Sequence, residues 1–568
     1  MVAPMSFMRS KTILTLFLIL TFGGIFRFWN LASAPVSLSM DEASVGYDAY
    51  SLLKTGRDMY GNFLPLAFRS VGDYKSPVLT YLTVPVTFII GLNELGTRFT
   101  VAFVGTLSIL ATYFLALELT KRRSAALLSS FALAISPWHI QASRSSFDGL
   151  LANFFLILAV WTFLMSIKKK MNLFIPVLLF ALSAYSYHAE RLMVPLLILC
   201  LVVIYYQQIF RLGKKLIFPL VFAIILGLPL LFILTHQQGQ ARLVSVFIGQ
   251  DYQINSQVKA SENGNIFDQL LANKYILLFN FWLKRYLNYW DLKFIFLDGS
   301  KLTQPGYPDV GLLNFFEIVP FFIGIWLVFV DSKIIADRKD RWLIALWLLF
   351  GPLAASLSNN EQHAGRSLST IPAPQIIVGV GLYFLLVKLK LSTSLAKQIT
   401  AAGFFLVVFI SVIYFFDIYF VHFPAQFSED WGYGRKQAIL YALQNKSQYE
   451  NIVIDPSYGT AGQTTIDAPY LYALYYSAYD PREFQTTPRR KEWPNSMNFD
   501  KFTFRSIYWP KDCAQGETLF IGSPWSLPSQ DIPPTKIVKK IFFLNGSLGF
   551  VVVNNSQPAI NCPALQAY

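Results

Sequence analysis

Apolar runs long enough to cross a membrane recur along most of the chain. A spanning helix needs about 20 consecutive, mostly apolar residues, and the sequence contains eleven runs close to this length. They lie near residues 12–29, 98–119, 124–140, 147–167, 172–188, 192–210, 214–235, 312–330, 341–358, 368–387 and 398–420. The pattern predicts an all-α, multi-pass membrane bundle with about eleven spanning helices.

The basic residues give this bundle a direction. Clusters of Lys and Arg follow every even-numbered run, and Arg9 and Lys11 precede the first. Short basic loops stay in the cytoplasm, so the N-terminus is predicted to be cytoplasmic. The clusters are Lys121–Arg123, Lys168–Lys170, Arg211 with Lys214 and Lys215, Lys333 to Arg341, and Lys388 with Lys390 and Lys397.

This orientation predicts a long first outer loop over residues 30–97 and a second over 236–311. A twelfth apolar run, from Pro77 to Leu92, would reverse every later loop if it spanned the membrane. It also contains Pro85 and ends next to a glycine, so we expect a juxtamembrane helix at the outer interface. The first run is followed by no convincing cleavage site, which predicts a retained helix and not a signal peptide.

Composition excludes a soluble protein. Of 568 residues, 54% are hydrophobic and only 14% are charged, and water cannot solvate such a surface. The net charge of +14 would suggest a nucleic-acid partner if it covered one soluble face, but here it is concentrated in the inner loops. We therefore expect a protein of the cytoplasmic membrane whose partner is the lipid bilayer, with no nucleic acid.

The pattern changes after residue 425. Short apolar runs such as Asn451–Ile454, Thr518–Gly522 and Gly549–Val553 are typical of buried strands, and residues 434–444 and 470–479 are expected to be helical. The sequence therefore predicts a transmembrane domain over residues 1–425 and a small extracytoplasmic α/β domain over 426–568. Cys513 and Cys562 fall in this tail, and one such pair is weak evidence for a disulfide.

Ionisable residues at the outer helix ends are the candidates for chemistry. Asp41 and Glu42 follow the first helix, and adjacent acids beside a membrane are costly unless they serve a substrate or cap a helix. Ser39 or Asp41 fits equally well as the N-cap of a helix over residues 42–54. Lys75 fits two interpretations: snorkelling to the interface, or binding an anionic head group.

Three arginines depart from the positive-inside pattern because they lie on the outer side. Arg144, Arg191 and Arg366 each need an anionic partner there, and a phosphate at the mouth of the bundle would serve all three. The alternative is internal pairing, of Arg144 with Asp148 and of Arg191 with Glu190.

The motifs together resemble a known group of enzymes. Asp41-Glu42, Tyr74-Lys75-Ser76-Pro77, Ser136-Pro137 with Arg144 and Asp148, and His363-x-x-Arg366 before Pro372 occur in this order. Over about residues 10–420 the chain resembles the GT-C fold glycosyltransferases. It is most similar to the bacterial family 39 or PMT-2 type, related to protein O-mannosyltransferases and aminoarabinose transferases.

The resemblance implies transfer of a sugar from a polyprenyl-phosphate-linked donor on the outer face of the membrane. A single displacement with in-line attack would invert the anomeric centre. Asp41 matches the family's first-loop acid, the candidate general base, with Glu42 beside it. Lys75 matches the K-x-P position that contacts the carrier phosphate, although Ser76 replaces the usual proline. His363 and Arg366 match a late phosphate motif.

The candidate site is thus a set of outer-face residues. Asp41 and Glu42 are the catalytic candidates; Lys75, Arg144, Arg191, His363 and Arg366 are the donor-phosphate candidates; Asp73, Tyr74, Asp148 and His188 are further candidates. Asp41 and Glu42 alone give little support for a divalent metal, and no cofactor is expected. The acceptor is a hydroxyl or phosphate on a protein, lipid or surface glycan. The alternatives are a transporter or flippase for an anionic lipid, or a transferase of another lipid-carried group.

Overall fold

The computed structural model describes residues 10–557 except for 237–246, 251, 262–272, 303, 305–307, 331–333, 336, 360–361, 389–393, 464 and 488–496. The chain divides into two compact units, and neither unit is continuous in sequence. The first comprises Met1–Trp29, Ser76–Leu79 and Val101–Phe415. The second comprises Asn30–Lys75, Thr80–Thr100 and Phe416–Tyr568. The predicted boundary at residue 425 stays a prediction.

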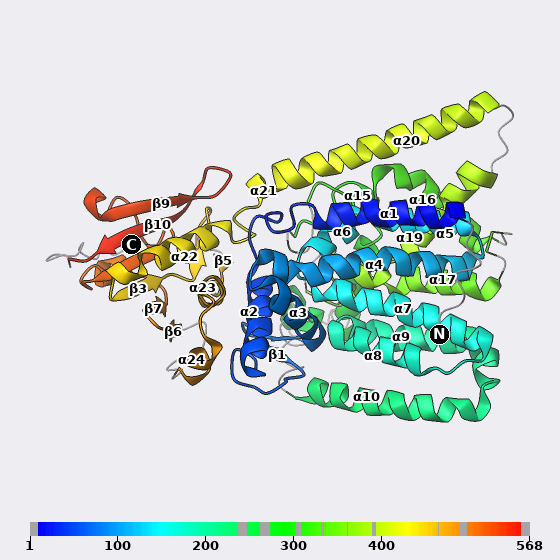
Figure 1. Cartoon of the computed structure of the whole chain (residues 1–568), viewed down its shortest axis with the longest axis horizontal. Helices are drawn as coiled ribbons and strands as arrows, with labels where there is room; N and C mark the ends of the chain where they lie inside the picture. Colours follow the sequence, from blue (N-terminus) through cyan, green and yellow to red (C-terminus); the bar gives the residue numbers. More distant parts are fainter. Residues whose placement is uncertain are drawn as a thin grey trace. The chain divides into compact units, whose positions relative to one another are not determined.

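The first unit is a bundle of helices that run roughly parallel to one another (Figure 1). Among the described residues, six helices are long and apolar enough to cross a membrane. They are α1 (Ser10–Phe28), α4 (Glu94–Thr120), α7 (Asp148–Lys169), α9 (Glu190–Phe210), α10 (Ile217–Thr235) and α20 (Ser394–Asp417). The prediction of a multi-pass, helical membrane protein is confirmed.

Shorter helices occupy the other predicted runs. They are α5 (Arg123–Ala134), α6 (Pro137–Arg144), α8 (Phe174–Ser186), α16 (Ile318–Phe329), α17 (Arg338–Phe350), α18 (Leu353–Ser356) and α19 (Ala373–Tyr383). Three runs expected to be single helices are broken, at Ser136-Pro137, at Gly351-Pro352 and at Ile371-Pro372. A proline lacks the N–H that would continue the helix and disfavours helical backbone at the residue before it. Residues 124–140 and 341–358 therefore form two helices each.

Small residues let helices of the bundle core approach closely. A side-chain carbon added at Gly381 of α19 would lie 1.9 Å from the carbonyl oxygen of Pro320 in α16. One added at Gly379 would lie 2.1 Å from Oγ of Ser129 in α5. Without water between them, membrane helices associate through such close packing.

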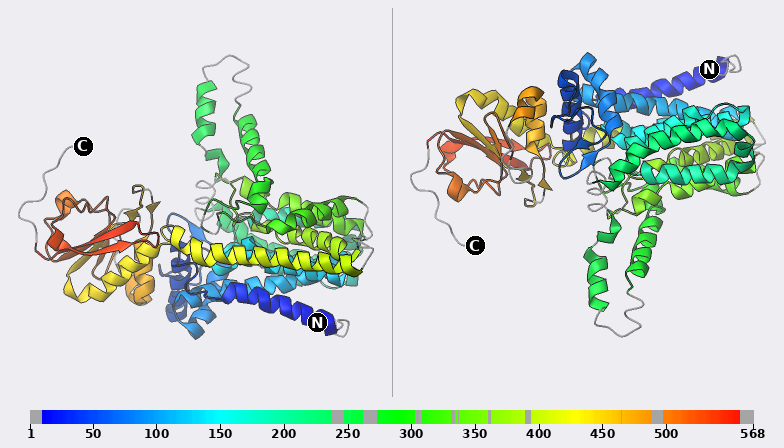
Figure 2. Two further views of the ribbon diagram at one scale, coloured as in Figure 1. Left: turned by 90° about the horizontal axis from the view of Figure 1, so that it is seen from above. Right: turned by 90° about the horizontal axis from the view of Figure 1, so that it is seen from below.

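The second outer loop leaves the bundle as a helical pair. The helices α12 (Tyr252–Ser261) and α14 (Lys274–Asn288) extend away from the parallel helices (Figure 2). The chain then returns through α15 (Leu292–Phe296). The indole of Trp282 donates to Oγ of Ser356 at 3.0 Å, so α14 is attached to α18 of the bundle.

The tail forms the predicted α/β domain around a six-stranded sheet with the order β6-β7-β3-β8-β10-β9. Its central strand β3 is parallel to β7 and β8, and the other pairs are antiparallel. The strands are β3 (Asn451–Ile454), β6 (Met497–Phe499), β7 (Phe502–Phe504), β8 (Thr518–Gly522), β9 (Ile537–Phe542) and β10 (Leu548–Asn555). Helices α22 (Tyr433–Asn445), α23 (Pro469–Ser477), α24 (Pro481–Thr486) and α25 (Trp509–Asp512) complete it.

Most of the first outer loop packs with this tail inside the second unit. It contains α2 (Met40–Thr55), a two-stranded ribbon of β1 (Phe68–Arg69) and β2 (Tyr74–Lys75), and most of α3 (Pro77–Ile90). Tyrosines at and just beyond α23 bind the loop. The hydroxyl of Tyr470 lies 2.9 Å from that of Tyr60, and the carbonyl of Tyr479 accepts from Tyr47 at 2.9 Å. The two segments therefore share one hydrophobic core.

Helix α3 buries polar side chains and exposes large apolar ones, which is the reverse of the pattern in a soluble protein. Its threonines Thr80, Thr83 and Thr87 are buried, whereas Phe88 and Ile89 are more than 70% exposed. With 14 residues at 1.5 Å per residue, it reaches about 21 Å, short of the ~30 Å hydrocarbon core. These features fit the predicted juxtamembrane helix.

Candidate functional site

The two acids at the start of α2 have different surroundings. Ser39 is the N-cap: its hydroxyl accepts from the N–H of Glu42 at 3.2 Å, and its own N–H donates to Glu42 Oε2 at 2.9 Å. This reciprocal pair is a capping box. Asp41, one residue earlier, is exposed. The structure thus assigns the cap to Ser39 and leaves the Asp41 carboxylate at the surface of the loop.

The Glu42 carboxylate also holds a buried arginine. Arg98, at 0% exposure, donates from Nε to Glu42 Oε1 at 2.8 Å and from Nη2 to Oε2 at 3.1 Å. The same guanidinium donates to the carbonyl oxygens of Leu31, Pro35 and Ser37. Glu42 and Arg98 therefore attach the start of the loop to α2. These contacts also fix the backbone that carries Asp41.

Lys75 lies beside two polar residues of α2. The ribbon pairs Lys75 with Phe68 and Tyr74 with Arg69. The Lys75 ammonium lies 3.5 Å from Oδ2 of the buried Asp48 and donates to the hydroxyl of Ser44. Sequence reasoning missed Asp48. The available signal was spacing: Asp41, Ser44 and Asp48 recur at i, i+3 and i+7, which places them on one side of a helix.

Burial changes the protonation of Asp48. Removal of the carboxylate from water, and to a smaller extent the charge of Asp58, raises the pKa of Asp48 to about 7, although Lys75 and the N–H of Met59 act in the opposite direction. Asp73 and Tyr74 form the turn before Lys75, where Asp73 Oδ1 accepts from the Tyr74 N–H at 2.6 Å. The turn and the ribbon together fix the Lys75 backbone.

Further candidates gather at the end of the first unit that the sequence predicts to lie outside. Arg144, fully buried, donates to the carbonyl oxygens of Phe26 and Trp29 at 2.7 Å each. Arg27 donates to Leu133 and Ala134 carbonyls, and its Nη2 lies 2.8 Å from His139 Nδ1. These two arginines fix the end of α1 against α5 and α6. Arg27 was not among the predicted site residues.

A second set surrounds the loop between α8 and α9. The buried Tyr187 hydroxyl experiences the charges of Asp148, Arg366 and Glu190. Arg191 is attracted by Asp148, and the main-chain carbonyl of His188 accepts from the N–H of Arg191 at 3.2 Å. Asp148, Arg191 and Arg366 are thus brought into one electrostatic neighbourhood.

The late motif continues this neighbourhood. The N–H of Arg366 donates to Nδ1 of His363 at 3.3 Å, and the N–H of His363 donates to the hydroxyl of Tyr289 at 3.0 Å. Tyr289 experiences the positive charges of Arg366 and Arg285. The charge of Arg366 therefore acts on two buried phenols, those of Tyr187 and Tyr289.

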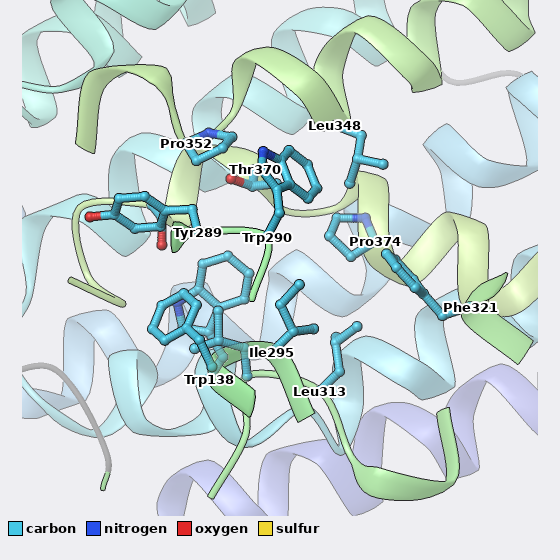
Figure 3. A pocket seen from close by; sticks show the side chains of 13 residues that line it. Trp138, Tyr289, Trp290, Ile295, Leu313, Phe321, Leu348, Pro352, Thr370 and Pro374 are labelled. Atoms are coloured by element: carbon cyan, nitrogen blue, oxygen red, sulfur yellow. The ribbon is translucent and has the colours of Figure 1, made fainter. Parts of the chain in front are cut away.

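Tyr289 also borders an apolar pocket. Figure 3 shows Trp138, Ile295 and Leu313 along one side of this pocket and Trp290 and Pro352 along the other. Trp138 is fixed by its indole N–H, which donates to the carbonyl of Ala364 at 2.7 Å. The pocket therefore adjoins the segment that carries His363 and Arg366. Its aromatic walls suit a hydrocarbon chain.

The residues that the structure describes contain no group of three or more His, Cys, Asp or Glu side chains that could hold a metal ion. Cys513 is a disulfide cysteine, while Cys562 lies outside the described residues. Asp41, Glu42, Asp73, Tyr74 and Lys75 belong to the second unit. Arg144, Asp148, His188, Arg191, His363 and Arg366 belong to the first.

Comparison with known proteins identifies related sequences over part of the chain. Residues 15–183 match the family described as dolichyl-phosphate-mannose-protein mannosyltransferase. A protein of Aquifex aeolicus (strain VF5), described as uncharacterized, is 30% identical over 138 residues. That match spans 24% of this chain and 26% of the relative.

Solved structures match over much more of the chain. ArnT from Cupriavidus metallidurans in the apo state has a TM-score of 0.56 at 12% identity, covering 96% of this chain and 98% of ArnT. ArnT bound to undecaprenyl phosphate has a TM-score of 0.56 at 13% identity, covering 96% and 99%. An oligosaccharyltransferase of Archaeoglobus fulgidus has a TM-score of 0.49 at 14% identity, covering 83% of this chain and 63% of that protein. The ArnT likeness confirms the predicted GT-C fold.

Proposed function

We propose that this protein is a membrane glycosyltransferase that moves a sugar from a polyprenyl-phosphate-linked donor to a hydroxyl or phosphate acceptor. The observation that carries the proposal is the fold, which covers 96% of the chain and matches an ArnT structure bound to undecaprenyl phosphate. The outer-end arginines beside an apolar pocket add support, because a lipid phosphate has a charged head and a hydrocarbon chain.

The roles of the residues follow from the chemistry of the transfer. An acceptor oxygen forms a bond to the anomeric carbon as the bond from that carbon to the donor phosphate breaks. A hydroxyl acceptor loses its proton, and the exposed carboxylate of Asp41 is the base we assign to it. The carrier phosphate leaves with an additional negative charge, which cations stabilise. Attack opposite the leaving group inverts the anomeric centre.

We assign the donor phosphate to Lys75 among the residues of the second unit. Among those of the first unit we assign it to Arg191, His363 and Arg366. Glu42 and Arg144 are engaged in holding the first loop and the end of α1, so we assign them positioning roles. The disulfide at Cys513 supports an extracytoplasmic tail, because disulfides persist in oxidising compartments. With the basic inner loops, this supports transfer on the outer face of the cytoplasmic membrane.

The test is transfer by the full chain reconstituted in vesicles with a radiolabelled polyprenyl-phosphate sugar and mixed membrane acceptors. We expect labelled product with the unmodified chain and a loss of about 100-fold or more with Asp41→Asn, the scale of a missing general base. Asp531→Asn, at an exposed carboxylate of the tail, is the matched control. Movement of labelled lipid across the bilayer without any transfer would support a flippase and refute the proposal.

A further inference from the structure

The ammonium of Lys75 already has an anionic neighbour in the protein. It lies 3.5 Å from Asp48 Oδ2 and donates to the Ser44 hydroxyl. Lys75 keeps a side-chain exposure of 13%, whereas that of Asp48 is 1%. The pair therefore has one member that is partly exposed and one that is buried.

The Asp48 carboxylate has little else to hold it. Oδ1 accepts the Met59 N–H at 3.1 Å, but Oδ2 accepts no hydrogen bond from any residue that the structure describes. Lys75 is the cation beside Oδ2. A buried carboxylate with one unsatisfied oxygen is costly in its charged form, so the pair is held together mainly by its opposite charges.

Every element packed against Asp48 contributes to its electrostatic surroundings. The ribbon supplies Lys75, the turn after α2 supplies Asp58, α2 supplies Tyr47, and α23 supplies Tyr470. Tyr470 in turn contacts Tyr60 and experiences the charge of Arg69. Asp58 is fixed by the N–H groups of Tyr60 and Asn62, both within 2.9 Å. Lys75 is thus the cation that contacts Asp48, and the phenols are neutral near neutral pH.

We propose that Asp48 is a positioning residue that competes with the donor phosphate for Lys75, so that protonation of Asp48 frees the Lys75 charge for the phosphate. The inference rests on the proposed function, because it takes Lys75 as a phosphate ligand. The proton goes to the Asp48 carboxylate, and no covalent bond changes. Ser44 keeps the ammonium close to α2 in both states.

The direction of the pH effect follows from the raised pKa of Asp48, which is about 7. Below that pH the group is a neutral acid, and Lys75 carries an uncompensated positive charge. Above it the carboxylate cancels that charge, and a bound phosphate raises the pKa of Asp48 further. If binding raises it by one unit, affinity differs about tenfold between the two limits.

The experiment measures binding and does not depend on transfer. The probe is a radiolabelled polyprenyl methyl phosphodiester, which has no group that titrates between about pH 5.5 and 8.5. Its equilibrium affinity for the full chain in nanodiscs is measured across that range. We expect about tenfold tighter binding at the acidic limit than at the basic limit, and for Asp48→Asn a clearly smaller difference between the two limits. Asp531→Asn is expected to keep the unmodified pH dependence.

Two results would overturn the inference: flat affinity in the unmodified chain, or an unchanged pH dependence in Asp48→Asn. If Asp48→Asn does not fold, Lys75→Gln decides instead, because Asp48 acts only through Lys75. We expect Lys75→Gln to bind weakly and with a clearly smaller pH dependence than the unmodified chain, and an unchanged dependence would refute the assignment. Probe binding in a chain that catalyses no transfer would refute the proposed function and leave this inference standing.

Discussion

Asp41 and Glu42 are adjacent acids of α2, and replacing each by its amide is expected to impair a different property of the protein. Glu42→Gln removes the counter-charge of Arg98, whose guanidinium is at 0% exposure and donates to both carboxylate oxygens, at 2.8 and 3.1 Å. Asp41→Asn changes an exposed side chain that is not the helix cap. The first variant is therefore expected to lose stability, and the second to lose transfer.

The magnitude follows from the burial of the pair. Leaving one member of a buried ion pair without its partner costs about 3–5 kcal/mol. In Glu42→Gln the new amide oxygen can still accept from the Ser39 N–H, so the loss comes mainly from the missing charge. In the double variant Glu42→Gln with Arg98→Met, the uncompensated charge is gone. We expect that variant to recover most of the lost stability, since apolar replacement of a buried pair is often neutral.

The assay is thermal unfolding of the purified full chain, followed by intrinsic fluorescence, together with transfer measured per folded molecule. Glu42→Gln should lower the unfolding midpoint, and Asp41→Asn should leave it unchanged while abolishing transfer. The reasoning is refuted if Glu42→Gln unfolds at the unmodified midpoint and still loses transfer, because Glu42 would then act in the chemistry and not in the frame of the loop.

Two further variants test the packing of each unit. Gly381→Ala places a carbon 1.9 Å from the Pro320 carbonyl oxygen and should destabilise the bundle by about 1–3 kcal/mol, the usual cost of overpacking; Gly403→Ala, with open space around it, is the control in the same unfolding assay. Arg435→Met removes the buried partner of Asp467, 2.9 Å away, and should cost about 3–5 kcal/mol, measured as faster proteolysis of the tail in the full chain. Unchanged proteolysis would show that this ion pair does not stabilise the tail.

The helices were predictable because lipid immersion leaves a direct mark on the sequence. Each predicted apolar run contains a helix, because a chain in hydrocarbon must bury its backbone polar groups and can do so locally. The breaks at Ser136-Pro137 and Gly351-Pro352 were visible in the sequence but were outweighed by the continuous hydropathy around them. Hydropathy indicates whether a segment lies in lipid or in water. It does not indicate whether the helical hydrogen bonds continue through that segment.

The tail was predictable as single elements but not in its packing with the first loop. The strands at Asn451–Ile454 and Thr518–Gly522 have the expected bounds. The contacts of Tyr60 with Tyr470 and of Tyr47 with Tyr479 join residues more than 400 positions apart. Nothing local in a tyrosine-rich helix indicates which distant segment it will meet.

The sequence predicted which residue types lie at the candidate site. It predicted the role of each residue less well. The anionic partner expected for Arg144 stays a prediction, and two of its nitrogens donate to the main-chain carbonyls of Phe26 and Trp29. A guanidinium serves carbonyls as well as phosphates, so position alone does not separate these uses. Asp48 was missed because an acid in mid-helix resembles a solvated one until the strand bearing Lys75 is placed beside it.

The union of the first outer loop with the tail has a consequence for biogenesis. The ribosome releases residues 30–100 long before residues 416–555, yet both contribute to a single core. Through synthesis of the intervening helices, the early segment waits at the membrane surface with its partner surface uncovered. Completion of this core therefore depends on residues 416–555, and a frameshift within them is expected to disable a loop encoded near the start.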